Sequence, residues 1–193
     1  MTAVTRTKLH WFEKTVEYAF VMKHAHHLTL ASPLDGNHER AADAIFGIQD
    51  AKWLLIEFKR GSGDLRSEED KYSPYQAAKD ALSKESEGMH FFVYGVLPPH
   101  DDKLQLIAAP YWQRNPLLSI DDLLKNKGCG NSVTFWEYIE KLVAQKSSGK
   151  GGGGGPDYSF IAAVTNGGHI QTVSSLSEVF PNGPTHQPTL GYP

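Results

Sequence analysis

Residues 41–59, AADAIFGIQDAKWLLIEFK, decide the fold of this chain. Residues 41–48 are apolar or small apart from Asp43, and residues 52–59 are almost continuously apolar until Glu57 and Lys59. Three residues separate the two runs, which predicts two strands joined by a tight hairpin. A strand with as few polar positions as the second run is typically buried on both faces of a sheet.

Amphipathic and turn-forming segments precede and follow this hairpin. Residues 8–24 predict a helix, because apolar side chains recur along one stripe at helical spacing. The stripe consists of Leu9, Phe12, Val16, Ala19 and Phe20. Residues 27–31 predict a short strand, and the polar, glycine-containing residues 61–71 predict a flexible loop.

The second half of the chain alternates between strand and helix signals. Ser73 and Pro74 predict a helix that runs to about residue 87, with the serine as N-cap and the proline at the first helical position. Residues 89–97 and 104–111 predict two strands, which we expect to be antiparallel. The remaining predicted elements are helices at 120–125 and 134–146, a hairpin of residues 158–165 and 169–173, and an extended end from residue 181.

This order of elements predicts an α/β or α+β sandwich and not a doubly wound dinucleotide-binding fold. We expect a mixed central sheet flanked by helices, with a C-terminal helix and hairpin added to it. The core would comprise residues 1–146. Residues 147–156 would form a Gly-rich flexible loop, and residues 157–193 a C-terminal hairpin and extended tail that pack on the core.

Composition excludes several classes of protein. The chain has 193 residues, of which 40% are hydrophobic, so it can bury the core of one globular domain. No run approaches the roughly 20 apolar residues that span a bilayer, and residues 1–8 do not resemble a signal peptide. The single cysteine, Cys129, cannot form an internal disulfide, so we expect a cytoplasmic protein. The net charge of −3 does not indicate a surface that binds nucleic acid as a whole, although a local basic patch is compatible with it.

The residues that indicate a functional site are Asp43, Glu57 and Lys59. An acid in an apolar strand is costly to bury unless it is paired or binds a cation. Glu57 and Lys59 are two positions apart and therefore point to the same face of their strand. The short turn brings Asp43 alongside them. Paired carboxylates suit Mg²⁺, which prefers oxygen ligands, and a neighbouring lysine can act on water or on a phosphate.

The pattern of Asp43 on one strand and Glu57-Phe58-Lys59 on the next resembles the PD-(D/E)XK nuclease superfamily. The residue before Asp43 is alanine instead of the proline of that pattern. The resemblance covers about residues 8–111 and implies an α/β, restriction-endonuclease-like fold with an αβββαβ core. It also implies a helical glutamate, for which Glu17 is the first candidate and Glu13 the second. An additional motif in the following helix would correspond to Tyr72 and Gln76.

The resemblance implies a Mg²⁺-dependent endonuclease that hydrolyses phosphodiester bonds of DNA, with Mn²⁺ able to replace Mg²⁺. Asp43 and Glu57 would hold the metal, Lys59 would orient or deprotonate the attacking water, and Glu17 and Gln76 would support them. The basic residues Arg60, Arg66 and Lys71 would contact DNA. A homodimer is a further expectation, because cutting two strands often requires two copies.

Other interpretations of the same residues remain open. Asp43 could cap a turn at the start of its strand, and Glu57 and Lys59 could form an ion pair on a solvated face. The alternative function is a non-catalytic interaction or inhibitor protein of a phage or defence system that keeps the nuclease-like fold.

Overall fold

A computed structural model of the chain describes residues 10–34, 41–99, 101, 103–146, 161–175 and 178. The described residues form an eight-stranded sheet with the order β6-β5-β4-β3-β2-β1-β7-β8. The strands are β1 (Leu28–Pro33), β2 (Ala44–Ile48), β3 (Lys52–Lys59), β4 (His90–Val96), β5 (Gln105–Pro110), β6 (Leu118–Ser119), β7 (Ile161–Asn166) and β8 (His169–Ser175).

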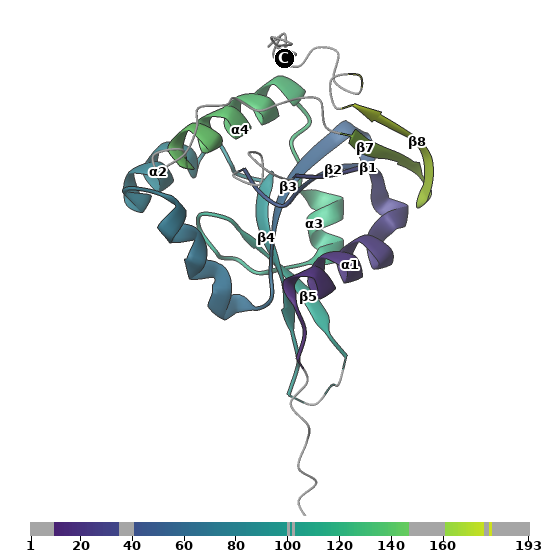
Figure 1. The fold of residues 1–193 in the computed structure, drawn as a ribbon, viewed down its shortest axis with the longest axis horizontal. Helices are drawn as coiled ribbons and strands as arrows, with labels where there is room; N and C mark the ends of the chain where they lie inside the picture. Colours follow the sequence, from purple (N-terminus) through teal and green to yellow (C-terminus); the bar gives the residue numbers. More distant parts are fainter. Residues whose placement is uncertain are drawn as a thin grey trace, which may run out of the picture.

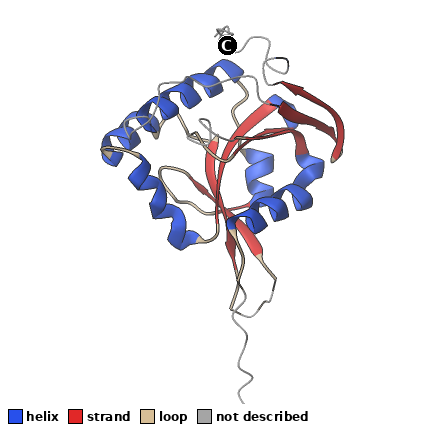
Figure 2. Cartoon of the chain, viewed as in Figure 1, coloured by secondary structure: helices blue, strands red, loops and turns tan. Residues whose placement is uncertain are grey.

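Helices cover both faces of this sheet (Figures 1 and 2). The α-helices are α1 (Glu13–His24), α2 (Tyr75–Leu82), α3 (Ile120–Asn126) and α4 (Ser132–Lys146). The 3₁₀ helices are η1 (Ala25–His27), η3 (Gln49–Ala51) and η4 (Ser62–Lys71). Helices α1 and α3 pack on one face, and α2 and α4 pack on the other. Within the described residues, no helix is both long and apolar enough to cross a membrane.

The sheet is mixed because β3 and β4 run parallel, whereas every other neighbouring pair is antiparallel. A parallel pair needs a long crossover connection. Here residues 60–89 make it, and they include η4 and α2. The crossover therefore lies next to the end of β3, where Glu57 and Lys59 are located.

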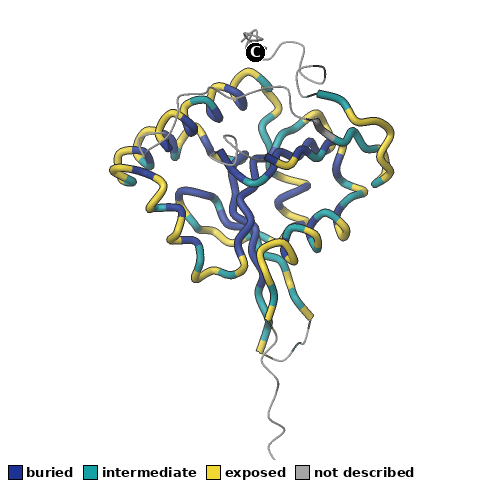
Figure 3. Tube along the Cα trace, in the orientation of Figure 1, coloured by how far each residue is buried: buried dark blue, intermediate teal, exposed yellow. Residues whose placement is uncertain are grey.

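Two apolar cores enclose β3, which runs through the most deeply buried part of the sheet (Figure 3). Leu54, Ile56 and Phe58 pack in the core beneath α1 and α3. Leu55 points to the opposite face and packs in the core beneath α2 and α4. Because side chains alternate along a strand, Glu57 and Lys59 share the face of Leu55. The predicted burial of this strand on both faces is confirmed.

The prediction of an α/β chain with a mixed, helix-flanked sheet is confirmed, and the bounds of β3 are those predicted. The C-terminal hairpin also forms, and β7 pairs with β1, so it extends the central sheet. The Gly-rich segment at 147–156 and the end from residue 181 lie outside the described residues.

Three local predictions were wrong. Helix α1 begins at Glu13, and Phe12 is its N-cap with 79% of its surface exposed, so Phe12 is not part of the buried stripe. Pro74, and not Ser73, is the N-cap of α2, which ends at Leu82 instead of about residue 87. Residues 62–71 form the helix η4 and not a loop.

Candidate active site

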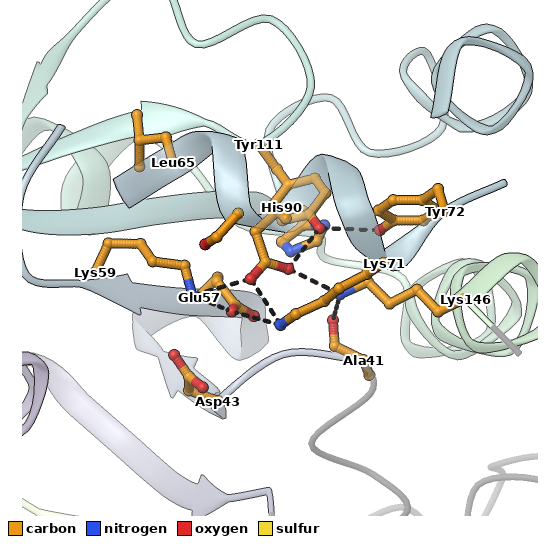
Figure 4. Close-up of polar contacts among 12 residues, drawn as sticks. Ala41, Asp43, Glu57, Lys59, Leu65, Lys71, Tyr72, His90, Tyr111 and Lys146 are labelled. Atoms are coloured by element: carbon orange, nitrogen blue, oxygen red, sulfur yellow. Dashed lines mark hydrogen bonds and ion pairs between the residues drawn. The ribbon is translucent and has the colours of Figure 1, made fainter. Parts of the chain in front are cut away.

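Asp43 lies where the pairing of β2 with β3 ends. Its backbone N–H still donates to Ile56 O (3.1 Å), but its side-chain Oδ2 accepts the next N–H of β3, that of Phe58 (2.5 Å). A side chain thus replaces a backbone acceptor at this point. The strand register ends at the pair Ala44 and Ile56, and Figure 4 shows the Asp43 carboxylate beside Glu57. The structure thus brings the two carboxylates close together, and Asp43 contributes to the raised pKa of Glu57.

Glu57 and Lys59 extend beyond the paired part of β2 and remain hydrogen-bonded to β4 on their other side. Lys59 Nζ donates to Glu57 Oε1 (2.6 Å). Both side chains are buried, and Glu57 is only 1% exposed. The pair therefore lies inside the protein, which excludes an ion pair on a solvated face.

Helix η4 brings a second acid and a second lysine to the same place. A 3₁₀ helix has three residues per turn, so Leu65, Glu68 and Lys71 lie along one line. Leu65 and Glu68 are the buried residues of this helix. Lys71 Nζ contacts Glu57 Oε1 (3.2 Å) and Glu68 Oε1 (2.6 Å), while Lys59 Nζ also contacts Glu68 Oε1 (2.9 Å).

The cluster is closed on its inner side by the end of α4 and by Tyr111, which follows β5. Lys146 Nζ, at the end of α4, contacts Glu68 Oε2 (3.4 Å) and donates to Ala41 O (3.2 Å). The Tyr111 hydroxyl donates to Glu68 Oε2 (3.1 Å) and is itself within hydrogen-bond distance of the Tyr72 hydroxyl (2.9 Å). Figure 4 shows Lys59, Lys71 and Lys146 converging on one group of carboxylates, with Asp43 beside it.

Burial shapes the protonation of the two sheet carboxylates. Burial raises the pKa of Glu57 to about 8; Asp43 and Glu68 act in the same direction, and Lys146 opposes them. Burial also raises the pKa of Asp43 to about 6, against the effects of the Phe58 N–H and Lys59. Near neutral pH the site therefore holds a proton that a cation bound to Glu57 would displace.

Glu68 and Lys59 are held in their charged forms. Burial alone would raise the pKa of Glu68, but Lys146, the neighbouring Glu57 carboxyl group, Lys71 and Lys59 together keep that pKa well below its usual range. Burial would lower the pKa of Lys59, but Glu57 and Glu68 raise it above its ordinary value. Lys59 is thus an ammonium ion throughout the physiological pH range.

The structure brings Glu13, the second candidate, closer to the cluster than Glu17. Glu13 Oε2 lies 3.9 Å from Lys59 Nζ. Glu17 is one turn further along α1, where its carboxylate accepts from Lys14 Nζ (2.6 Å). Glu17 also lines an apolar groove of about 360 Å³ between α1 and the strands β1, β2 and β7.

Three other predicted site residues are exposed at the surface. Gln76 is exposed on α2, and its amide donates to Asp80 Oδ1 (2.7 Å). Arg60 binds Asp64 through its guanidinium group (3.2 Å), and Arg66 is exposed on η4. Arg60, Arg66 and Lys71 were the residues predicted to contact nucleic acid. In the part of the chain that the structure describes, Lys71 is the one among them that contacts the buried carboxylates.

Sequence reasoning missed Glu68, Lys146 and Tyr111. Glu68 stands among four acids in a segment that reads as a polar loop. Its signal was the three-residue spacing of Leu65, Glu68 and Lys71, which is the period of a 3₁₀ helix and not that of a loop. Lys146 gave no local signal, because its partners are far away in the sequence.

The donor set fits a hard divalent ion in composition. Asp43 and Glu57 supply carboxylate oxygens, the ligands that Mg²⁺ prefers alongside several waters. No N–H or O–H group in the described part of the chain donates to the buried Glu57 Oε2. Within residues 10–34, 41–99, 101, 103–146, 161–175 and 178, however, no three His, Cys, Asp or Glu side chains are arranged to hold a metal.

Comparison with known proteins identifies no relative. No protein-family model matches the chain, and neither a curated protein nor a solved structure resembles it significantly.

Proposed function

We propose that this protein is a metal-dependent nuclease that hydrolyses phosphodiester bonds of DNA. The observation that carries the proposal is that Asp43, which accepts the Phe58 N–H where the β2–β3 ladder ends, lies beside Glu57, and that Lys59 Nζ is 2.6 Å from Glu57 Oε1. Three acids and three lysines surround this point. Such a concentration of buried charge is costly for a protein that needs only a stable core, which favours a functional role.

Asp43 and Glu57 would hold Mg²⁺ or Mn²⁺. When bound, the ion would lower the pKa of a coordinated water and stabilise the charge that develops on the phosphate. Because Lys59 is an ammonium ion, its role would be to orient the water or neutralise phosphate charge, and not to remove a proton. Lys71 is the most exposed lysine of the cluster, at 40%, and would approach the DNA backbone from the solvent side.

The direct test is cleavage of plasmid and linear DNA in Mg²⁺, in Mn²⁺ and after chelation. We expect metal-dependent cleavage that Asp43→Asn abolishes. Asparagine keeps an oxygen that can accept from the Phe58 N–H, so the fold should be retained. Asp50→Asn is the matched control, because Asp50 is an exposed acid in the turn between the same two strands. Metal-independent cleavage, or equal cleavage by wild type and Asp43→Asn, would refute the proposal.

One observation favours the alternative of a non-catalytic interaction protein. The carboxylates of Glu57 and Glu68 are already paired with Lys59, Lys71 and Lys146, so they have counter-ions without a metal. A protein of that kind would neither cut DNA nor gain thermal stability from Mg²⁺ or Mn²⁺. Melting curves with and without each ion, recorded for wild type and Asp43→Asn, therefore separate the two functions.

A further inference from the structure

Glu68 occupies an unusual position in the charged cluster. Its Oε1 and the Oε1 of Glu57 alternate with the ammonium groups of Lys59 and Lys71, so that each lysine bridges both acids. The four contacts are between 2.6 and 3.2 Å long. Neither lysine therefore depends on Glu57 alone for its position.

Glu68 is also the more firmly held of the two acids. Its other oxygen, Oε2, accepts from Tyr111 (3.1 Å) and contacts Lys146 (3.4 Å), and its side chain is 1% exposed. Lys146 is fixed in turn by Ala41 O. Tyr111, which follows β5, and Lys146 of α4 thus hold Oε2 of Glu68, while its Oε1 contacts the two lysines.

We infer that Glu68 is the positioning residue of the site, which holds the ammonium groups of Lys59 and Lys71 in place when Glu57 is taken up by a metal ion. The inference rests on the proposed function and deepens it. A cation on Glu57 repels both ammonium groups, and without Glu68 they would move away from the reacting phosphate. With Glu68 they remain beside it as two fixed positive charges.

The catalytic test compares Glu68→Gln with Glu69→Gln. Glu69 is the neighbouring acid on η4 and pairs with Arg114 instead of the cluster (2.7 Å). Outer partners of a metal site typically contribute 10- to 100-fold to activity. We expect Glu68→Gln to lower kcat by about this factor with little change in KM, and Glu69→Gln to leave both unchanged. Equal kcat values for the two variants would overturn the inference.

A second readout does not depend on nuclease activity. Lys71 is 40% exposed and Lys141, which pairs with Glu85 outside the cluster, is 53% exposed. Acetic anhydride labelling followed by mass spectrometry would measure the reactivity of Lys71 relative to Lys141. We expect Glu68→Gln to raise this ratio several-fold and Glu69→Gln to leave it unchanged. An unchanged ratio in Glu68→Gln would show that Glu68 does not hold Lys71.

The labelling experiment also tests the positioning role of Glu68 separately from the nuclease function. A wild type that cuts no DNA would refute the nuclease function, whereas the Lys71 ratio would still report whether Glu68 holds the lysines. Glu68→Gln leaves Lys146 buried without its acid, which is strongly destabilising. Should that variant fail to fold, Glu68→Gln combined with Lys146→Met removes both members of the pair, and the same rise in Lys71 labelling is expected.

Discussion

The carboxylate of Asp43 accepts the N–H of Phe58, a donor that the β2 backbone would otherwise satisfy. The interaction ends the β2–β3 ladder and leaves Glu57 and Lys59 paired only with β4. Asp43 thus has a structural role in the strand pair and also places a carboxylate beside Glu57.

Lys59→Met should separate catalysis from metal binding. An ammonium ion cannot be a metal ligand, so we expect the variant to lose cleavage and still bind Mn²⁺ in calorimetric titration. Asp43→Asn should lose both, because it weakens an oxygen ligand. Cleavage by Lys59→Met at the wild-type rate would reduce Lys59 to a structural partner of Glu57.

Glu13 should matter more than Glu17. Glu13 Oε2 lies 3.9 Å from Lys59 Nζ, whereas the Glu17 carboxylate is paired with Lys14. We expect Glu13→Gln to lower the cleavage rate and Glu17→Gln to leave it near the wild-type value. Cleavage rates of the two variants measured at equal Mg²⁺ concentration test this expectation. A larger loss of rate in Glu17→Gln than in Glu13→Gln would show that Glu17 is the helical glutamate of the site.

The metal-free protein should become less stable as the pH rises from about 6.5 to 8. Glu57 has its pKa raised to about 8 in the folded state, so over this range the folded protein binds a proton that the unfolded chain has released. Stability then falls with pH by at most about 1.4 kcal/mol per unit. Below this range the lowered pKa values of His24 and His90 act in the opposite direction.

Urea unfolding of wild type and Glu57→Gln at several pH values checks this expectation. The amide does not titrate, so the decline between pH 6.5 and 8 should disappear in the variant. A decline that persists unchanged in Glu57→Gln would assign the proton to another group.

Gly95→Ala should destabilise the protein by about 1–3 kcal/mol, the usual cost of overpacking. A Cβ at this position would lie 2.6 Å from Trp11 Nε1 and 2.9 Å from Leu104 Cδ1. It would therefore disturb the hydrogen bond from Trp11 Nε1 to Arg60 O. Gly63→Ala is the matched control, because nothing lies within 4 Å of its added carbon. Denaturant midpoints of the two variants should differ clearly.

The elements that could be predicted are those whose own residues determine them. Strand β3 was predicted with its observed bounds because a long apolar run between turns leaves few alternatives. The predicted start of helix α2 was wrong because Pro74 keeps an extended backbone (φ −86°, ψ 145°). Pro74 therefore precedes the helix as its N-cap. Helix η4 was missed because its composition is polar and its period is three residues, not 3.6.

The candidate site was predictable only in its sheet half. Asp43, Glu57 and Lys59 interrupt apolar strands and are visible from pattern alone. Glu68 and Lys146 reach the site through tertiary packing, which no local periodicity records. The choice between Glu13 and Glu17 depended on which turn of α1 lies beside the end of β3. The packing angle of the helix decides this, and the spacing of residues along the helix does not reveal that angle.

The hydrogen bond between Lys146 and Ala41 spans 105 residues of sequence, and the ion pair between Lys146 and Glu68 spans 78. Contacts this remote form only after a large loop has been closed, which slows their formation. During synthesis Ala41, Glu57 and Glu68 all leave the ribosome well before α4. The acids then lack one of their three counter-ions, and burying them is correspondingly unfavourable. The charged centre of this protein should consequently be among the last parts to assemble, and a partly synthesised chain would lack it.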